Sequence, residues 1–237
     1  SKGATEVGTL QELALANEVV FLCLPSSQVV AKTIAAIRPS LRQGQIIIDS
    51  GTSKPQSTRE LAGELAALGV AYADAPVTGG PEQAALAELG VLCGAERQTF
   101  EAIKSLLSCF ASTVRHMGPV GSGHAAKLIS NYLVTGMIAL VAEAFATASK
   151  AHIDWRDLYD VMLNGSGNSG VLRKMVAPAL QGDFEGYRFA TANALKDIGY
   201  FKEFAREFGA PSQLTAAVEQ VFSKAVSNGL AEENGSH

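Results

Sequence analysis

The sequence predicts a layered α/β domain with a parallel sheet, followed by a long connecting helix and an all-α domain. Up to about residue 120, short β-rich runs alternate with helical stretches. From about residue 121 the strands stop, and every later apolar stretch repeats with a helical period. Strands that alternate with helices are typical of parallel βαβ units. We therefore expect one domain over 1–120 and a second over 121–237.

The first domain is expected to contain five strands and three helices. The strand segments are short and rich in valine, isoleucine and aromatic residues, as in EVVFLCLP and QIIIDS. The predicted strands are 18–25, 45–50, 70–76, 89–94 and 113–118. Helices are predicted after the first, second and fourth of them, at 27–38, 54–69 and 96–110.

The second domain is expected to be helical throughout. Its first helix, at about 122–150, connects the two domains. Gly209 and Pro211 mark the end of one later helix and the start of the next, because glycine commonly follows a helix and proline commonly opens one. The remaining helices are predicted at 154–164, 170–181, 191–209 and 211–229.

Composition argues against several kinds of partner. The chain has 237 residues, 47% of them apolar and 18% charged, which is enough for a sizeable core. A net charge of -4 without a Lys/Arg run, and 7% aromatic residues, give no sign of a nucleic-acid surface. No apolar run reaches the roughly 18 residues of a membrane span, and the first residues lack the apolar core of a signal peptide. We expect a cytoplasmic protein with no nucleic-acid and no membrane partner.

The cysteines and histidines show no metal-site spacing. Cys23, Cys93 and Cys109 are odd in number, far apart and set in apolar strings, which argues against a disulfide framework or a metal knuckle. The histidines form no HxH or HExxH pattern. We expect reduced thiols and no bound metal.

The stretch GPVGSGHAAKLISNY, at 118–132, carries a lysine and an amide one helical turn apart. Positions four apart share a helix face, so Lys127 and Asn131 can converge on one small molecule. A lysine in a partly desolvated cleft has a lowered pKa and can accept a hydroxyl proton as hydride leaves the carbon. The glycines of this stretch would let the helix start approach cofactor and substrate closely. Taken alone, the same spacing is found in ordinary solvated pairs.

Two further stretches carry candidate binding residues. In DAPVTGGPEQA, the backbone N–H groups of Thr78, Gly79 and Gly80, with the Thr78 hydroxyl, suit a carboxylate, although an ordinary glycine turn has the same composition. In ALKDIGYF, Lys196 and Asp197 form a charged pair in mid-helix, a pattern that is usually a surface feature.

Taken together and in this order, the three stretches resemble the β-hydroxyacid dehydrogenase family, which includes 3-hydroxyisobutyrate dehydrogenase, tartronate semialdehyde reductase and related glyoxylate or succinic semialdehyde reductases. DAPVTGG resembles the family's substrate-binding motif, GPVGSGHAAKLISN its catalytic motif and LKDIG its late cofactor motif. FLCLPSSQVV and IIIDSGTSKP resemble its nicotinamide-side loops. The resemblance covers nearly the whole chain and implies a Rossmann domain, a long interdomain helix and a helical domain that builds homodimers or homotetramers.

The resemblance also implies an activity and a role for each matching residue. The activity is hydride transfer between NAD or NADP and a small β-hydroxyacid or its semialdehyde, so a small carboxylate is the expected substrate. Lys127 would be the catalytic acid/base, and Asn131 its catalytic partner that also orients the substrate. The substrate carboxylate would be bound by Thr78, Gly79 and Gly80. Cofactor contacts would come from Leu24, Pro25, Val29 (by spacing only), Thr52, Lys196 and Asp197.

The chain departs from the family pattern at several positions. Ser130 replaces the first of two successive asparagines, Thr78 replaces a common serine, and Gly170 replaces an aromatic residue, which predicts a roomier or differently shaped substrate pocket. No histidine follows Lys127 as in the decarboxylating 6-phosphogluconate dehydrogenases. We therefore expect oxidation without decarboxylation.

The start of the sequence resembles the middle of a Rossmann domain. The family's first strand, its G-x-G-x-x-G turn and its second strand would precede residue 1, about forty residues by the usual size of a βαβ unit. We expect a chain that is N-terminally truncated relative to the family, or one that has lost these elements. The residue that separates NAD from NADP lies in that missing part, so the sequence does not show which cofactor is preferred.

Two other functions stay open at this point. An imine reductase shares this architecture but usually has another residue in place of Lys127, and a panel of cyclic imines would distinguish it. The other is a dehydrogenase-like oligomerisation module without catalysis.

The sequence also predicts self-association. Apolar stretches such as NYLVTGMIALVAEAFATA exceed what one small domain buries, so we expect a homo-oligomer with the long helix at the subunit interface.

Overall fold

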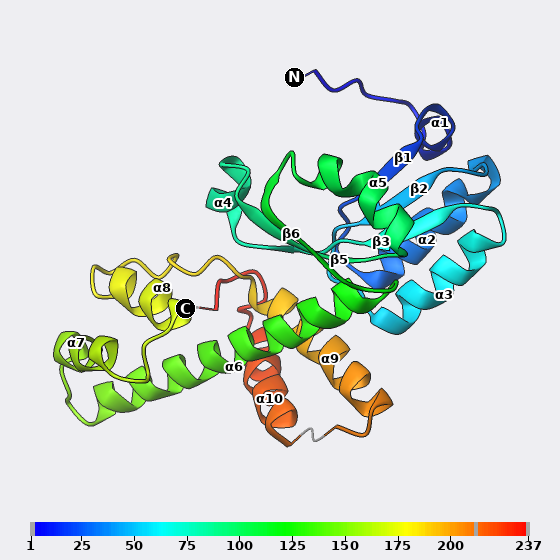
Figure 1. The fold of residues 1–237 in the computed structure, drawn as a ribbon. Helices are drawn as coiled ribbons and strands as arrows, with labels where there is room; N and C mark the ends of the chain where they lie inside the picture. Colours follow the sequence, from blue (N-terminus) through cyan, green and yellow to red (C-terminus); the bar gives the residue numbers. More distant parts are fainter. Residues whose placement is uncertain (1–2, 211–212, 236–237) are drawn as a thin grey trace. The chain divides into compact units, whose positions relative to one another are not determined.

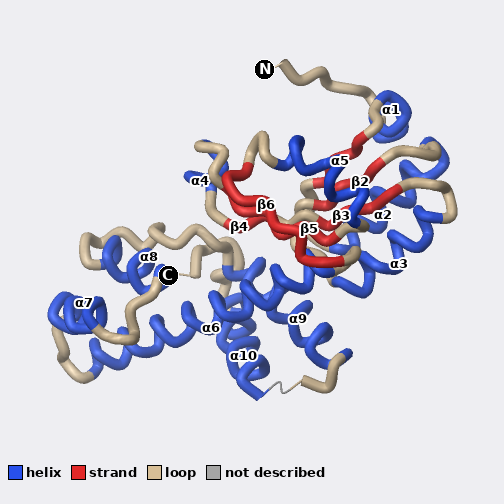
Figure 2. The backbone as a smooth tube through the Cα atoms, in the orientation of Figure 1, coloured by secondary structure: helices blue, strands red, loops and turns tan. Residues whose placement is uncertain are grey.

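The computed structural model describes residues 3–210 and 213–235, so the predicted helix start at Pro211 lies outside the described part. The chain divides into two compact units, Ser1–Lys127 and Leu128–His237. Among the described residues, the strands belong to the first unit and the second is built from helices (Figure 2). The predicted α/β layer fold followed by a helical part is confirmed.

The first unit has a six-stranded sheet. Its strands are β1 (Val19–Leu22), β2 (Ile46–Asp49), β3 (Ala71–Asp74), β4 (Val77–Thr78), β5 (Leu89–Gly94) and β6 (Ala111–Gly118). The pairs β1/β2, β2/β3 and β5/β6 are parallel. All five predicted strands are present, whereas β4 was not predicted, because two residues are too few to show an alternating pattern.

The expectation of parallel pairing fails at one place in the sheet. Strand β5 pairs antiparallel with both β3 and β4. The segment between β3 and β5 holds β4 and the short helix α4 (Pro81–Ala85), whereas a parallel connection usually needs a crossover helix of full length. The sheet is therefore mixed, although most of it is parallel.

Helices cover both faces of this sheet (Figure 1). Helices α1 (Leu10–Ala16), α2 (Ser27–Ile37) and α3 (Pro55–Ala66) contribute apolar side chains to the core on one face, and α5 (Arg97–Leu107) packs on the other. Side chains alternate between the two cores along β1, β2 and β3, as Ile47 and Ile48 do in β2. The 3₁₀ turn Arg38–Ser40 follows α2. Both α1 and α4 were missing from the prediction.

The second unit packs its helices around one apolar core. These helices are α7 (Trp155–Asn164), α8 (Gly170–Ala179), α9 (Thr191–Glu207) and α10 (Gln213–Ser227). The core includes Ile138 and Phe145 of the long helix α6 (Ser122–Lys150), whose start belongs to the first unit and whose remainder belongs to the second.

Helix α6 also corrects an expectation about apolar length. It is 29 residues long and apolar enough to pass a length-and-hydropathy test for a membrane span, although core helices of other proteins pass the same test. Only 22% of its most apolar stretch is buried within this chain. Ile129, Leu133 and Leu140 are among its exposed side chains.

Candidate active site

Helix α6 carries both predicted catalytic residues. Lys127 lies in its second turn and is half-buried, and Asn131 follows one turn later with 8% of its surface exposed. Because a helix repeats every 3.6 residues, the two side chains leave the same face of α6. The predicted spacing is therefore realised on one continuous helix.

The start of α6 is capped by a carboxylate from the sheet. Asp74, the last residue of β3, is fully buried, and its two oxygens accept the N–H groups of Gly121 (2.6 Å) and His124 (2.7 Å). Such groups at a helix start have no partner within the helix, and the helix dipole favours a negative charge there. Burial raises the pKa of Asp74, although His124 and these two N–H groups act to lower it.

The glycines before and within the first turn of α6 allow this close approach. A Cβ atom on Gly123 would lie 2.3 Å from the carbonyl oxygen of Leu92 and 2.7 Å from that of Asp74. One on Gly94 of β5 would lie 2.6 Å from the Asp74 carboxylate. Gly121 has a φ of +92°, which favours glycine. These glycines seat the helix directly on the strand ends, a role that the sequence analysis had not assigned to them.

The bonds to Asp74 distinguish this helix start from a pyrophosphate-binding turn. Residues 121–126 read GSGHAA, follow a strand and open a helix, as in a dinucleotide-binding turn. That turn binds anions through free N–H groups, whereas two of the N–H groups here are donated to Asp74. The turn therefore holds the protein's own carboxylate where a dinucleotide site would hold a phosphate.

A second buried carboxylate lies near the same helix. Asp49, the last residue of β2, accepts from the Gly51 N–H (2.9 Å), the Ser53 hydroxyl (3.0 Å) and the Tyr72 hydroxyl (3.3 Å). The ring of His124 lies between the two acids, with Nε2 3.7 Å from Asp49 Oδ2 and Nδ1 3.8 Å from Asp74 Oδ2.

Neither of these acids nor His124 was predicted from the sequence as a site residue. Asp49 and Asp74 end neighbouring parallel strands, so they reach the same edge of the sheet, a signal that the sequence already contained.

The predicted carboxylate-binding turn follows β4. Thr78 is half-buried and sits opposite Gly90 of β5, where only a glycine leaves room for its hydroxyl. Gly79 is exposed with a φ of +109°. The Gly80 N–H is donated to the Gln83 side chain at 2.9 Å, so a bound carboxylate would have to compete with Gln83 for that donor.

Asp197 connects the two predicted polar sites of the second unit. It is 3% exposed, and its Oδ2 accepts from Asn131 Nδ2 at 2.6 Å. The Lys196 ammonium lies 3.2 Å from Asp197 Oδ1 and 5.6 Å from the ring centre of Tyr200. Because an ionised carboxylate can only accept, the Asn131 carbonyl oxygen must point elsewhere. Lys196 and Asp197 therefore belong to a polar cluster with Asn131, and Asp197 is buried and not a surface residue.

The predicted cofactor residues of the first unit lie at the carboxyl ends of two adjacent parallel strands. The loop after β1 holds Leu24 and Pro25, and the loop after β2 holds Thr52. A Cβ on Gly51 would lie 2.7 Å from the Leu24 carbonyl oxygen, so the two loops run side by side.

Ligands of open α/β sheets bind at this edge. The partly exposed leucine, proline and threonine fit a nicotinamide cofactor, because they offer apolar contact to a ring and a hydroxyl to a ribose. Val29, half-buried in the first turn of α2, donates its N–H to the Ser26 hydroxyl (3.4 Å).

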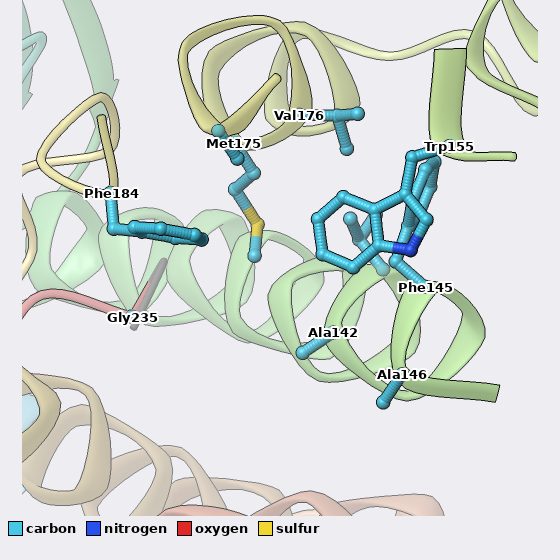
Figure 3. Close-up of a pocket in the computed structure, with 10 residues that line it drawn as sticks. Ala142, Phe145, Ala146, Trp155, Met175, Val176, Phe184 and Gly235 are labelled. Carbon is cyan, nitrogen blue, oxygen red and sulfur yellow. The ribbon is translucent and has the colours of Figure 1, made fainter. Parts of the chain in front are cut away.

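The second unit also contains a cavity of about 180 Å³. Figure 3 shows Met175 and Trp155 pointing toward α6 beside Phe145 and Phe184. Its lining is apolar and includes none of the predicted site residues. It has no arrangement of polar groups that could orient a substrate.

Comparison with known proteins identifies the family. A family model for the NAD-binding domain of 6-phosphogluconate dehydrogenase matches residues 1–118. A second, described as NAD-binding of NADP-dependent 3-hydroxyisobutyrate dehydrogenase, matches residues 121–237.

Individual relatives point to the same family as these two models. The chain is 30% identical to 2-(hydroxymethyl)glutarate dehydrogenase of Eubacterium barkeri over 99% of this chain and 79% of the relative. It is 29% identical to L-threonate dehydrogenase of Haemophilus influenzae, over 93% and 74% of the two chains. Its structure resembles that of Mycobacterium tuberculosis 3-hydroxyisobutyrate dehydrogenase with L-serine, with a TM-score of 0.86, 27% identity and coverage of 95% and 79%. This chain belongs to the β-hydroxyacid dehydrogenase family.

Proposed function

We propose that this protein oxidises a small β-hydroxyacid to its semialdehyde, or carries out the reverse reduction, with NAD or NADP and without decarboxylation. The observation that carries the proposal is the fixed amide of Asn131, one helical turn from Lys127. A nicotinamide cofactor supplies a hydride acceptor. The remaining chemistry is a proton transfer and the orientation of an alcohol, for which these two side chains are suited.

The roles follow from what each group can donate or accept. As hydride leaves the carbinol carbon, the neutral Lys127 amine takes the hydroxyl proton, and in the reverse direction its ammonium returns it. The Asn131 amide donates to Asp197, so its carbonyl oxygen is the acceptor that can hold the substrate hydroxyl. We assign the substrate carboxylate to Thr78, Gly79 and Gly80, with the Gln83 side chain displaced from the Gly80 N–H.

The cofactor contacts are assigned in the same proposal. Leu24, Pro25, Val29 and Thr52 would contact the cofactor from the strand ends of the first unit. Lys196, held by Asp197, would contact it from α9.

The names of the relatives define a substrate class. 2-(Hydroxymethyl)glutarate, L-threonate and 3-hydroxyisobutyrate are all acids that carry a hydroxyl group. We therefore propose that the substrate needs both groups. Turnover of these three acids and L-serine, followed by formation of NADH or NADPH, tests the proposal, with isobutanol as an alcohol without a carboxylate. Turnover of at least one acid and none of isobutanol is expected, and turnover of no acid would contradict the proposal.

We also propose that the protein associates with a second copy of itself through the helical unit. The exposed apolar side chains of α6, among them Leu133 (64% exposed) and Leu140 (65%), support this, because isolated chains rarely expose such a stretch. Sedimentation should show a dimer or larger species, and Leu140→Glu should shift it toward monomer. A monomeric profile of the unaltered chain would overturn this part of the proposal.

A further inference from the structure

The first turn of α6 is connected to the cofactor-side loops through buried polar groups. Asp74 holds the turn through two N–H groups, and Asp49 holds the loop that contains Thr52 through the Gly51 N–H and the Ser53 hydroxyl. The ring of His124, which is itself part of the turn, lies between the two carboxylates. All three side chains are fully buried.

The hydroxyl of Thr58, in α3, fixes the ring of His124. Thr58 Oγ1 lies 3.1 Å from the Lys54 carbonyl oxygen and 2.8 Å from His124 Nδ1. The bond between Thr58 and Nδ1 holds the ring whichever of the two atoms carries the proton. Nε2 faces Asp49, and among the described residues it has no hydrogen-bond partner.

The same network reaches the first cofactor-side helix. The Lys54 N–H is donated to the hydroxyl of Ser27, the first residue of α2, at 2.8 Å. The path from α6 through Thr58 therefore ends beside Pro25 and Thr52, the residues assigned to the cofactor.

Lys127 lies three residues after His124, about 4.5 Å farther along the helix axis. Backbone contact at Gly123 leaves the turn no room to shift toward the sheet. A displacement of about 1 Å at a reacting group can cost roughly a hundredfold in rate. The position of the Lys127 amine therefore depends on how firmly this first turn is held.

We propose that Asp74, His124 and Thr58 are positioning residues that hold Lys127 in register with the cofactor-side loops. The proposal rests on the proposed function for the role of Lys127, but the holding of the helix start does not. The resemblance to the family implied no role for Asp74, His124 or Thr58. Each acts through the first turn of α6 and not on the substrate.

The experiment compares Thr58→Val with Thr58→Ser, and both with Asp74→Asn. Valine removes the hydroxyl at nearly constant volume and so leaves no cavity, whereas serine keeps the hydroxyl. Asparagine replaces one accepting oxygen of Asp74 with an amide NH2 group, a donor that would face an N–H group of the turn. Hydrogen exchange of the peptide over 121–128, measured by mass spectrometry, reports the helix start whether or not turnover occurs. Kinetics with the acid and cofactor that the unaltered chain uses give kcat and both KM values.

We expect exchange of 121–128 to accelerate at least tenfold in Thr58→Val and in any folded Asp74→Asn, and to stay near the unaltered rate in Thr58→Ser. For Thr58→Val, kcat should fall roughly 10- to 100-fold with both KM values within about twofold. Unchanged exchange in Thr58→Val, or a loss of kcat that only follows the folded fraction, would overturn the proposal. Faster exchange together with a Lys127→Ala variant of normal turnover would support the holding network and refute the proposed function instead.

Discussion

The Asn131 amide donates to the buried Asp197 carboxylate over 2.6 Å, across 66 positions of sequence. This bond connects the predicted catalytic stretch of α6 with the predicted cofactor motif of α9, and it directs the Asn131 amide nitrogen toward Asp197, so that in the proposed mechanism the carbonyl oxygen faces the substrate. Two motifs that are far apart in the sequence, the one with Asn131 and the one with Asp197, are thus joined by a hydrogen bond.

Replacing Asp197 with asparagine should release that orientation. The new amide can donate to Asn131 as well as accept from it, so the Asn131 carbonyl oxygen is no longer directed. We expect kcat to fall at least tenfold and the free energy of unfolding to fall by about 1–3 kcal/mol. Asp160→Asn, an exposed acid of α7, is the matched control. Equal kcat in the two variants would remove Asp197 from the mechanism.

Thr78→Val should weaken binding of the acid more than binding of the cofactor. Valine keeps the shape of the side chain but removes the hydroxyl that we assign to the substrate carboxylate. The expected result is a KM for the hydroxyacid raised roughly tenfold, with the cofactor KM within about twofold. Thr78→Ser should preserve both values. A normal hydroxyacid KM in Thr78→Val would place Thr78 outside the site.

Two glycines of α6 should respond in opposite ways to alanine. In Gly123→Ala the methyl group would lie 2.3 Å from a backbone carbonyl oxygen, so we expect a loss of at least about 1–3 kcal/mol of stability, or failure to fold. Gly136 has no atom within 4 Å of the added carbon, and Gly136→Ala should stabilise the helix by up to about 1 kcal/mol. Thermal unfolding of both variants tests the seating of α6 on the strand ends, and similar shifts would contradict it.

Cys93 should be the protected thiol of the folded protein. Burial, and then the charge of Asp74, raise its pKa from 9.0 to about 12, whereas Cys23 and Cys109 are exposed. At pH 8 a disulfide reagent should modify two thiols quickly and the third only after denaturation. Equal reaction rates of all three thiols would contradict the buried position of Cys93.

The same shift predicts a pH dependence of stability. The folded-state pKa of Cys93 lies above the unfolded value, so the folded chain holds the proton more tightly. The resulting stabilisation is fully present below pH 9.0 and is lost as the pH rises toward about 12. Tyr72, whose pKa burial also raises, titrates at high pH as well, so the comparison is with Cys93→Ala. The stability difference between the two chains should shrink over this range, and a constant difference would contradict the assignment.

Much of the fold could be predicted from the sequence because its elements are long or strongly patterned. Helix α6 was predicted with the bounds that the structure gives, since its helical period is long and uninterrupted. Helix α1 was missed although Thr9 and Glu12 form a capping box, a signal present in TLQE. The antiparallel β5 could not be predicted from periodicity, because strand direction depends on how the connection runs in space.

Only those residues of the candidate site that lie in family motifs could be predicted from the sequence. Lys127, Asn131 and Asp197 were predicted as site residues from the motifs, but the bond between the last two joins distant segments, and no local pattern carries it. The role of His124 was still more difficult to predict from the sequence. Its partners Thr58 and Asp49 lie in other elements, so that a buried histidine network looked like a lone residue in a glycine-rich turn.

The measurement that tests the central claim most directly is turnover of Lys127→Ala beside the unaltered chain, with the best acid from the panel and the cofactor that binds more tightly by fluorescence titration with NADH and NADPH. Loss of the acid/base group should reduce kcat at least about a hundredfold while the cofactor affinity stays within about twofold. If Lys127→Ala keeps most of its turnover, Lys127 is not the acid/base and the mechanism proposed here is wrong.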